Sequence, residues 1–282
     1  MLILVVVCCL VSQPALAWGT RGHALVGEIA EKRLAKTSSE ALKKARLLLR
    51  ATNERDGKCR PVESARSFAD VASNPDDFRQ IELALVTRDW HFVNIEISHP
   101  TYDQNRDCAN GDCVVRRLER MIEILGDDKR EDCDRESALI YLIHFMGDLH
   151  QPFHTGFGRL PNGDPDLGGN RIKVMLDGEE KNLHSVWDSA LIERTKRSNK
   201  AWIKRLNTNV LAGRDPEPLA AGSVVDWTNE SHALRIERHL ENQQPPLALD
   251  DAYIAESTAI IEERLLLGGL RLARLIEEAL DK

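Results

Sequence analysis

The sequence predicts an all-α protein, a single compact multi-helix domain with one small β-hairpin. Apolar residues recur at steps of three and four along most of the chain, which is the period of an amphipathic helix. Strand-like alternation is confined to one short stretch, and no internal repeat or low-complexity linker divides the chain. Residues 18–282 are enough for one large domain.

The helical pattern covers residues 23–34, 40–49, 114–125, 137–149, 187–192, 201–211, 224–240 and 251–280. We expect the last segment to break or bend at Gly268-Gly269, because glycine weakens a helix. The stretch "NRIKVMLDGEEKNLH" has short apolar runs on either side of Asp177-Gly178, a dipeptide typical of a tight hairpin turn. Before it, "RLPNGDPDLGGN" has the composition of a loop.

The first 17 residues have the pattern of a cleaved export signal. They carry no charged side chain, and residues 2–11 form an apolar run that is too short to span a bilayer. Ala15, Leu16 and Ala17 match the A-x-A cleavage pattern. No Lys or Arg precedes the apolar run, so an atypical signal, a misassigned start codon and a membrane anchor stay open. We expect cleavage after Ala17, which makes Trp18 the first residue of a secreted or periplasmic monomer without stable membrane association.

Four cysteines remain after the predicted signal, and four cysteines allow three disulfide connectivities. An even number in an exported protein favours two disulfides. Cys108 and Cys113 close the short polar loop "CANGDC", so we pair them, and Cys59 with Cys133 follows by elimination. A cysteine–zinc site is the alternative, which the spacing does not favour.

The composition argues against a nucleic-acid binder that depends on a basic surface, because the net charge is −7. If the protein acts on phosphates, positive charge must be supplied locally. Bound metal ions are one source of such charge.

Histidine and aspartate are concentrated in two short stretches. In "LIHFMGDLHQPFH", His144 and Asp148 are four residues apart and share one helix face, and His154 follows the helix-ending Pro152. In "NLHSVWD", His184 and Asp188 repeat the spacing. Imidazole with carboxylate suits zinc, particularly at catalytic sites that leave a position open for water. Helix capping, surface charge and satisfied core histidines are the alternatives. His150 points away from the first pair, so we expect it at the surface or behind the ligands. We expect His99, His232 and His239 at the surface.

Together these motifs resemble the zinc-dependent single-strand nucleases and 3′-nucleotidases of fungi, plants and bacteria. The shared pattern runs in order from Trp18 to Asp188: Trp18-x4-His23, "FAD" ending at Asp70, "WHF" with His91, "HFMGDLHQPFH", "DLGGN" and "NLHSVWD". The combination is specific, although no single piece is. The resemblance implies a mainly helical nuclease domain over residues 18–282 with a cleft for three zinc ions.

The resemblance also implies a ligand set for each zinc ion. One ion would be held by Asp70, His91, His144 and Asp148. A second would be held by His154, His184 and Asp188. The third would be held by the α-amine and carbonyl oxygen of Trp18, by His23, and by Asp148 as a bridge.

The implied activity is hydrolysis of single-stranded DNA and RNA to 5′-phosphate products, together with removal of the 3′-phosphate from nucleotides. A water that bridges two zinc ions would attack phosphorus in line with the leaving oxygen, and zinc would lower the pKa of that water. Asp70 would orient or deprotonate the water. For substrate contacts the resemblance implies Phe92 stacking on a base, Asn94 at the base edge and Asn170 at a phosphate, with a core position for Phe92 as the alternative.

One departure from the family bears on activity. Many members carry Arg or Lys three residues after the aspartate that Asp70 matches, whereas this chain has Ser73, with Arg66 and Arg79 nearby in sequence. Two rival functions share the resemblance.

A zinc phospholipase C shares the three-zinc design, but its later pair is His-x3-Glu. A non-catalytic zinc-binding protein of the same fold is favoured only by Ser73.

Overall fold

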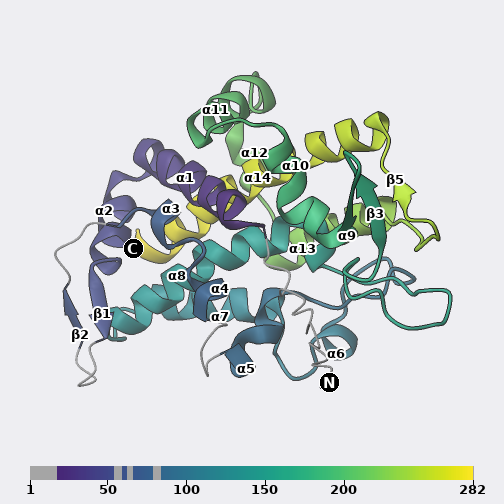
Figure 1. Cartoon of the computed structure of the whole chain (residues 1–282). Helices are drawn as coiled ribbons and strands as arrows, with labels where there is room; N and C mark the ends of the chain where they lie inside the picture. The colour runs from purple at the N-terminus through teal and green to yellow at the C-terminus, as the bar shows by residue number, and fades with distance from the viewer. Residues whose placement is uncertain (1–17, 54–58, 62–65, 79–83, 282) are drawn as a thin grey trace, which may run out of the picture.

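The computed structural model describes residues 18–53, 59–61, 66–78 and 84–281. The prediction of an all-α class is confirmed, because helices dominate and the strands are few and short (Figure 1). The longer helices are α1 (Thr20–Thr37), α2 (Ser39–Leu48), α7 (Val114–Gly126), α8 (Asp132–His150), α13 (Val224–Glu237) and α14 (Asp251–Leu280). No helix in this described part of the chain is long and apolar enough to cross a bilayer.

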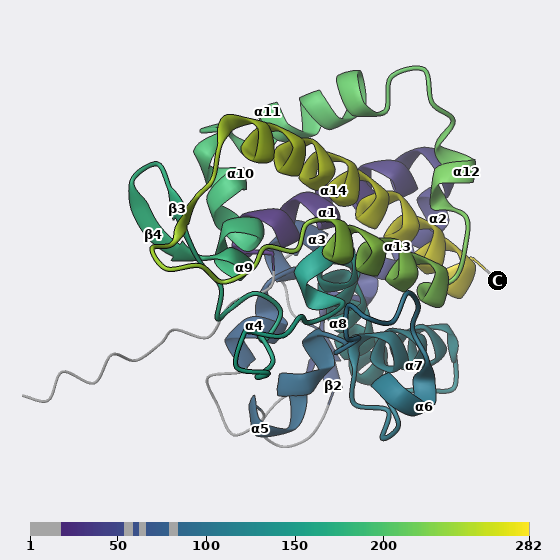
Figure 2. The ribbon, with the colours of Figure 1, turned by 90° about the vertical axis from the view of Figure 1, so that its right-hand side faces the viewer.

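Helix α8 is the centre of the fold. It packs against α7 on one side and against α1 and α14 on the other, and Figures 1 and 2 show it running between them. From Ala138 to its end, all but one of its residues are buried, because helices surround it rather than solvent. A helix in this position presents side chains to the interior on every face. Its last two turns, which carry His144 and Asp148, therefore lie inside the protein.

Helix α14 is continuous from Asp251 to Leu280, so the predicted break at Gly268-Gly269 is wrong. A Cβ atom at Gly269 would lie 2.4 Å from Cβ of Ile29 in α1, and one at Gly268 would lie 3.3 Å from the His150 ring in α8. The two glycines therefore allow close packing of three helices. The packing compensates for the weak helix propensity of glycine.

The predicted hairpin is confirmed as β3 (Lys173–Leu176) and β4 (Glu179–Asn182), which pair antiparallel from Lys173↔Asn182 to Leu176↔Glu179. Asp177 and Gly178 both have positive φ, as a two-residue hairpin turn requires. The sequence did not predict β5 (Leu247–Ala248), which pairs parallel with β3, or the small hairpin of β1 (Ala51–Asn53) and β2 (Cys59–Pro61).

Short elements join the long helices, and several of them carry the histidines. They are α3 (Phe68–Val71), α4 (Asn74–Phe78), α5 (Ala84–Thr87), η1 (Arg88–His91), α6 (Gln104–Asp107), η2 (Pro152–His154), α9 (Leu183–Ser185), η3 (Val186–Ala190), α10 (Leu191–Arg194), α11 (Asn199–Arg205), η4 (Leu206–Val210) and α12 (Pro216–Ala220).

Both predicted disulfides are present. Cys108 is bonded to Cys113, and Cys59 is bonded to Cys133. The second bond ties β2 to the start of α8, which fixes the end of the helix opposite to His144 and Asp148. The bond between Cys108 and Cys113 closes the short loop that precedes α7. Disulfides fit an oxidising compartment.

Candidate metal centre

The carboxylate of Asp148 lies at the centre of four histidines. Its Oδ2 is 3.2 Å from Nε2 of His144 and 3.1 Å from Nδ1 of His91. Its Oδ1 is 3.5 Å from Nε2 of His23 and 3.7 Å from Nδ1 of His154. Asp148, His23, His91 and His144 are fully buried. The i, i+4 spacing within α8 thus brings His144 and Asp148 together, and α1, η1 and η2 supply the other histidines.

Three groups of His and Asp side chains in the described residues could each hold a metal ion, since one potential ligand atom from every member lies within 4.8 Å of the others. The groups are His23, His144 and Asp148; Asp76, His91 and His144; and His154, His184 and Asp188. All members are buried. The predicted residues His23, His91, His144, Asp148, His154, His184 and Asp188 are therefore brought together.

The prediction that Asp70 joins His91 and His144 is wrong. Asp70 is exposed and caps the short helix α3, where its carboxylate accepts hydrogen bonds from the backbone N–H and the hydroxyl of Ser67. These bonds hold the pKa of Asp70 below its usual value. The position near the two histidines is taken by Asp76 of α4, whose Oδ1 is 3.7 Å from Nδ1 of His91 and 3.6 Å from Nε2 of His144.

With Asp76 in this position, the chain no longer departs from the family in lacking a basic residue three positions after the aspartate. Arg79 comes three residues after Asp76, the spacing at which the family often carries a basic residue. Arg79 lies outside the described residues. Arg66, the other basic residue considered, donates to the Leu49 carbonyl and pairs with Glu136. It is therefore engaged elsewhere.

Backbone carbonyls fix the orientation of three histidines. Nδ1 of His144 is 2.7 Å from the Ala72 carbonyl, Nδ1 of His154 is 2.8 Å from the His91 carbonyl, and Nδ1 of His184 is 2.7 Å from the Gly168 carbonyl. A carbonyl only accepts, so each Nδ1 carries the hydrogen and each Nε2 faces its group. This is the arrangement that metal-binding histidines usually have.

The donor geometry fits a cation. The Nε2 atoms of His154 and His184 are 3.2 Å apart, and in the neutral rings both carry lone pairs. Such lone pairs repel unless a proton or a metal ion lies between them. Both ring nitrogens of His23, Oδ1 of Asp148 and Oδ2 of Asp188 are buried without a hydrogen-bond partner. Unsatisfied buried polar atoms are costly, and coordination of a metal would satisfy them.

Burial lowers the pKa of His23 well below its usual range and also lowers the pKa of His184, so both rings are neutral as metal ligands must be. His154 differs. Burial would lower its pKa, but hydrogen bonding to Asp188 and the charges of Asp148 and Asp188 outweigh this and raise the pKa to about 9. Without metal, the carboxylates therefore hold a proton on His154.

Trp18 is fully buried beside the groups. Its neighbour Gly19 donates a backbone hydrogen bond to the Asp188 carbonyl, with an N···O distance of 2.8 Å. A Cβ atom at Gly147 would lie 2.5 Å from Nδ1 of His23 and 3.4 Å from Cδ1 of Trp18. The absence of a side chain at Gly147 therefore lets the start of α1 pack against α8 beside Asp148.

The second His-x3-Asp pair rests on irregular backbone. His184 lies in the single turn α9, and Asp188 lies in η3, a turn of π-helix. π-Helical turns are rare in proteins overall, but those that occur are often at functional sites. Gln151, a fully buried residue that the sequence did not single out, donates its side-chain amide to Asp188 and accepts from the Phe153 N–H.

The predicted substrate contacts lie near the groups. Phe92 is half-buried and Asn94 is exposed, and the chain between them donates a 2.8 Å hydrogen bond from Val93 N–H to the His154 carbonyl. Asn170 is half-buried, and its amide donates to the Leu167 carbonyl.

Two histidines outside the groups have structural partners. His150 accepts from Arg271 at 3.1 Å and donates to the Met146 carbonyl, so it lies outside the groups. It is fully buried, so a surface position for it is wrong. The surface position predicted for His232 is wrong. Its ring is fully buried between the carbonyls of Thr155 and His99, because α13 packs on these segments.

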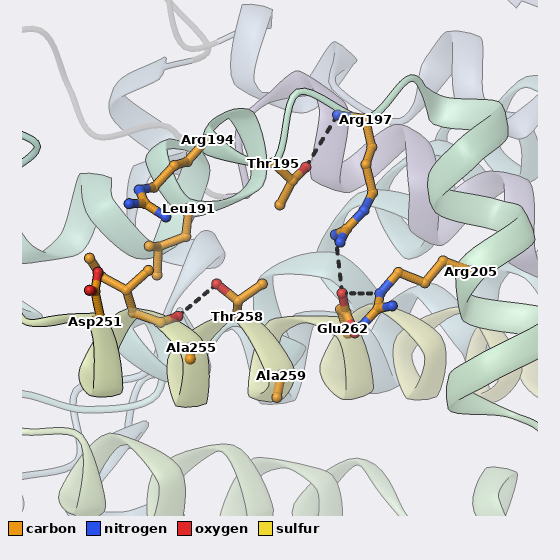
Figure 3. Close-up of a pocket in the computed structure, with 11 residues that line it drawn as sticks. Leu191, Arg194, Thr195, Arg197, Arg205, Asp251, Ala255, Thr258, Ala259 and Glu262 are labelled. Atoms are coloured by element: carbon orange, nitrogen blue, oxygen red, sulfur yellow. Dashed lines mark hydrogen bonds and ion pairs between the residues drawn. The ribbon is translucent and has the colours of Figure 1, made fainter.

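A separate cavity of about 350 Å³ lies between α10, α11 and α14. In Figure 3, Arg197 and Arg205 approach Glu262 of α14 from two sides, and both form ion pairs with it. None of the described residues that line this cavity is a histidine or belongs to the three groups. The cavity is therefore distinct from the metal centre.

Comparison with known proteins agrees with this geometry. The family model described as S1/P1 nuclease matches residues 18–281. The chain belongs to the S1/P1 nuclease family. Endonuclease 4 of Arabidopsis thaliana is 30% identical over 92% of this chain and 88% of that protein. Nuclease P1 of Penicillium citrinum is 26% identical over 93% of this chain and 97% of that protein, and nuclease S1 of Aspergillus oryzae is 24% identical over 77% and 69%.

Membership of the S1/P1 family makes this chain a hydrolase that acts on ester bonds in nucleic acids, and the family depends on metal. The three buried groups could hold that metal. Sequence reasoning missed Asp76, although the spacing of Asp76 and Arg79 was a signal that could have found it.

Proposed function

We propose that this nuclease uses three zinc ions to hydrolyse single-stranded DNA and RNA to 5′-phosphate products and to remove the 3′-phosphate of nucleotides. The observation that carries this proposal is the buried carboxylate of Asp148 shared among four histidines, in a chain of the S1/P1 family. Imidazole and carboxylate ligands suit zinc. Zinc ions would also supply positive charge locally in a protein of net charge −7.

We assign the ligands by group. Asp76, His91, His144 and Asp148 would hold one ion, and His154, His184 and Asp188 would hold a second. The α-amine and carbonyl oxygen of Trp18, with His23 and Asp148, would hold the third. Asp76 takes the place predicted for Asp70, and the buried, close-set His and Asp donor atoms support the side-chain part of each set.

When bound, zinc supplies Lewis acidity and lowers the pKa of water. The residues of the chain supply the rest. Asp76 would orient the attacking water and accept its proton, since its Oδ1 lies within 3.7 Å of ring nitrogens of His91 and His144. Phe92 would stack on a base, while Asn94 and Asn170 would contact the base edge and a phosphate. Stacking accepts any base, which suits weak sequence preference.

The non-catalytic alternative loses its only support, because Arg79 occupies the spacing that Ser73 left without a basic residue. The phospholipase alternative is less well supported than the nuclease, because the later pair ends in Asp188 and the matched family is a nuclease family.

The deciding experiment uses the chain that begins at Trp18. We expect about three zinc ions per chain by elemental analysis, release of nucleoside from a 3′-nucleotide and cleavage of single-stranded DNA. A phosphatidylcholine analogue serves as the control substrate and should not be hydrolysed. Zinc binding without hydrolysis of any phosphoester would overturn the enzymatic proposal, and turnover of the lipid alone would favour the phospholipase.

We also propose that residues 1–17 are an export signal and that the protein is secreted or periplasmic. The Trp18 amine can bind metal only after the bond to Ala17 is cut, because a peptide nitrogen has no available lone pair. A chain with one extra residue before Trp18 should bind one zinc ion less and lose most of its activity. An extended chain with full activity and three zinc ions would contradict the assignment of Trp18.

A further inference from the structure

Arg235 of α13 is a fully buried arginine that joins two separate segments of the metal centre. Its Nη2 forms an ion pair with Oδ2 of Asp166, which is also fully buried. Its Nε donates to the Gly156 carbonyl at 3.3 Å, and Nη1 is 3.1 Å from Nδ1 of His239. The guanidinium lies 4.6 Å from the centre of the Phe153 ring.

These partners belong to the segment that carries His154 and to the loop that orients His184. Phe153 and Gly156 lie on either side of His154 in the chain. Asp166 precedes Gly168, the residue whose carbonyl accepts from Nδ1 of His184. One guanidinium therefore joins the chain around His154 to the loop whose Gly168 carbonyl orients His184.

Asp166 organises the loop around that carbonyl. Its Oδ1 accepts from the Gly169 N–H at 3.2 Å, and its backbone carbonyl accepts from the Arg171 N–H at 3.0 Å. Between these bonds, Leu167, Gly168 and Gly169 all have positive φ. Leucine rarely adopts this conformation, so the surroundings must hold it.

The ion pair needs a reason other than stability. Burial of two charges is costly, and apolar residues of similar size often stabilise a fold as well or better. An arginine has a planar fork of five N–H donors that can reach several acceptors in fixed directions, which lysine cannot do. The contacts of Arg235 use this fork to connect η2, the segment after it and the loop of Asp166.

We propose that Arg235 is a positioning residue that sets the spacing of His154 and His184 and thereby the metal affinity of their group. Arg235 itself does not touch the metal or the substrate; it acts through Asp166 and Gly168. The inference rests on the proposed function in one respect, since it takes this group to hold a metal ion.

The test is Arg235→Lys in the chain that begins at Trp18, with zinc affinity measured by competition with a chromophoric chelator. We expect one zinc ion to bind about tenfold more weakly, within the range found when residues that orient metal ligands are changed. The other ions should bind as in the wild type. His184→Ala identifies the ion concerned, because it removes a ligand of the same group.

Arg271→Lys is the matched control. Arg271 is almost fully buried, pairs with Glu230, donates to the Leu219 carbonyl, lies over the Trp227 ring and contacts His150, but it contacts no member of the three groups. Both variants should lower the melting temperature. Only Arg235→Lys should weaken zinc binding.

Equal zinc affinities in the two variants, whether unchanged or weakened alike, would overturn the positioning role. If the wild type and His184→Ala instead bind the same number of zinc ions with the same affinities, the group of His184 holds no zinc. That result would overturn the proposed function, and the inference with it. If Arg235→Lys does not fold, the double variant Arg235→Met with Asp166→Asn replaces it. That variant leaves no unpaired charge and keeps a side-chain oxygen for Gly169, and the same tenfold weakening is expected.

Discussion

The two His-x3-Asp pairs have the same spacing in sequence but different structural support. His144 and Asp148 lie in the regular helix α8, which other helices cover on all sides. His184 and Asp188 lie where the single turn α9 passes into the π-helical turn η3. The first pair is placed by helix geometry and by one outside contact, the Ala72 carbonyl at His144, whereas the second pair needs Gly168, Gln151 and the Arg235–Asp166 ion pair.

A motif spacing therefore fixes a site only where regular secondary structure carries it. The pair on α8 should tolerate changes in its surroundings, because the helix backbone holds both side chains. The pair on α9 and η3 should be sensitive to residues that touch no metal. Substitutions at and around the two pairs test this contrast.

The largest effect is expected from Asp148→Asn, because Asp148 faces four histidines and two of the proposed ions share it. We expect kcat/KM on single-stranded DNA to fall by more than about 100-fold, beyond the usual cost of losing an outer partner of a metal ligand. Zinc analysis should show the loss of more than one ion. Asp188→Asn should lose a single ion, and equal losses in the two variants would contradict the central place of Asp148.

Asp76→Asn should also lower activity by about 100-fold or more, because it removes a proposed ligand. The matched control is Asp70→Asn. It weakens the cap of α3 and should cost up to about 1 kcal/mol of stability, with activity within about twofold of the wild type. Activity assays and thermal unfolding measure the two effects. The reverse result would restore the ligand role predicted for Asp70 from the sequence.

Much of the centre could be predicted from the sequence, because motif spacing and order brought out His23, His91, His144, Asp148, His154, His184 and Asp188. Asp76 could not be separated from Asp70 in this way. One aspartate caps a helix and the other points inward, and a linear sequence does not show which. The continuous α14 was missed for a similar reason: glycines that weaken an isolated helix permit close contacts with α1 and α8. The pairing of β5 with β3 depends on residues far apart in the chain.

Gly168→Ala tests the weaker support of the second pair. Gly168 has φ of +60°, and an added Cβ would lie 2.6 Å from the Phe153 carbonyl oxygen. This clash should displace the Gly168 carbonyl, which orients His184. One zinc ion should then bind about 10- to 100-fold more weakly. Gly147→Ala provides the comparison, since its Cβ would press on the His23 ring and should affect a different ion. Competition titrations that show the same ion lost in both variants would refute the assignment.

The smallest effect is a pH dependence at His154. Its pKa is raised to about 9 in the metal-free protein, above the usual 6.5, so its proton stabilises the fold fully below pH 6.5 and this stabilisation is lost as the pH rises through about 9. Metal must displace the proton, so binding at pH 7 should release about one proton from His154. Any proton from His144 adds to this, because the charges of Asp148 and Asp76 outweigh burial and raise its pKa as well. Calorimetry in buffers of different ionisation enthalpy counts the protons released. His23 and His184 have lowered pKa values, so the unfolded chain binds protons there more readily than the folded protein does. Their contribution therefore destabilises the fold as the pH falls below 6.5.

The glycine contact between α14 and α1 has a consequence for the order of assembly. His23 lies in α1, near the start of the described chain, and Ile29 of the same helix packs on Gly269 more than two hundred residues later. During synthesis, α1 must wait for α14 before it gains this neighbour. The helix that carries His23 would therefore reach its final packing late, although α14 supplies no ligand, and a chain that stops before α14 should bind zinc at this position more weakly.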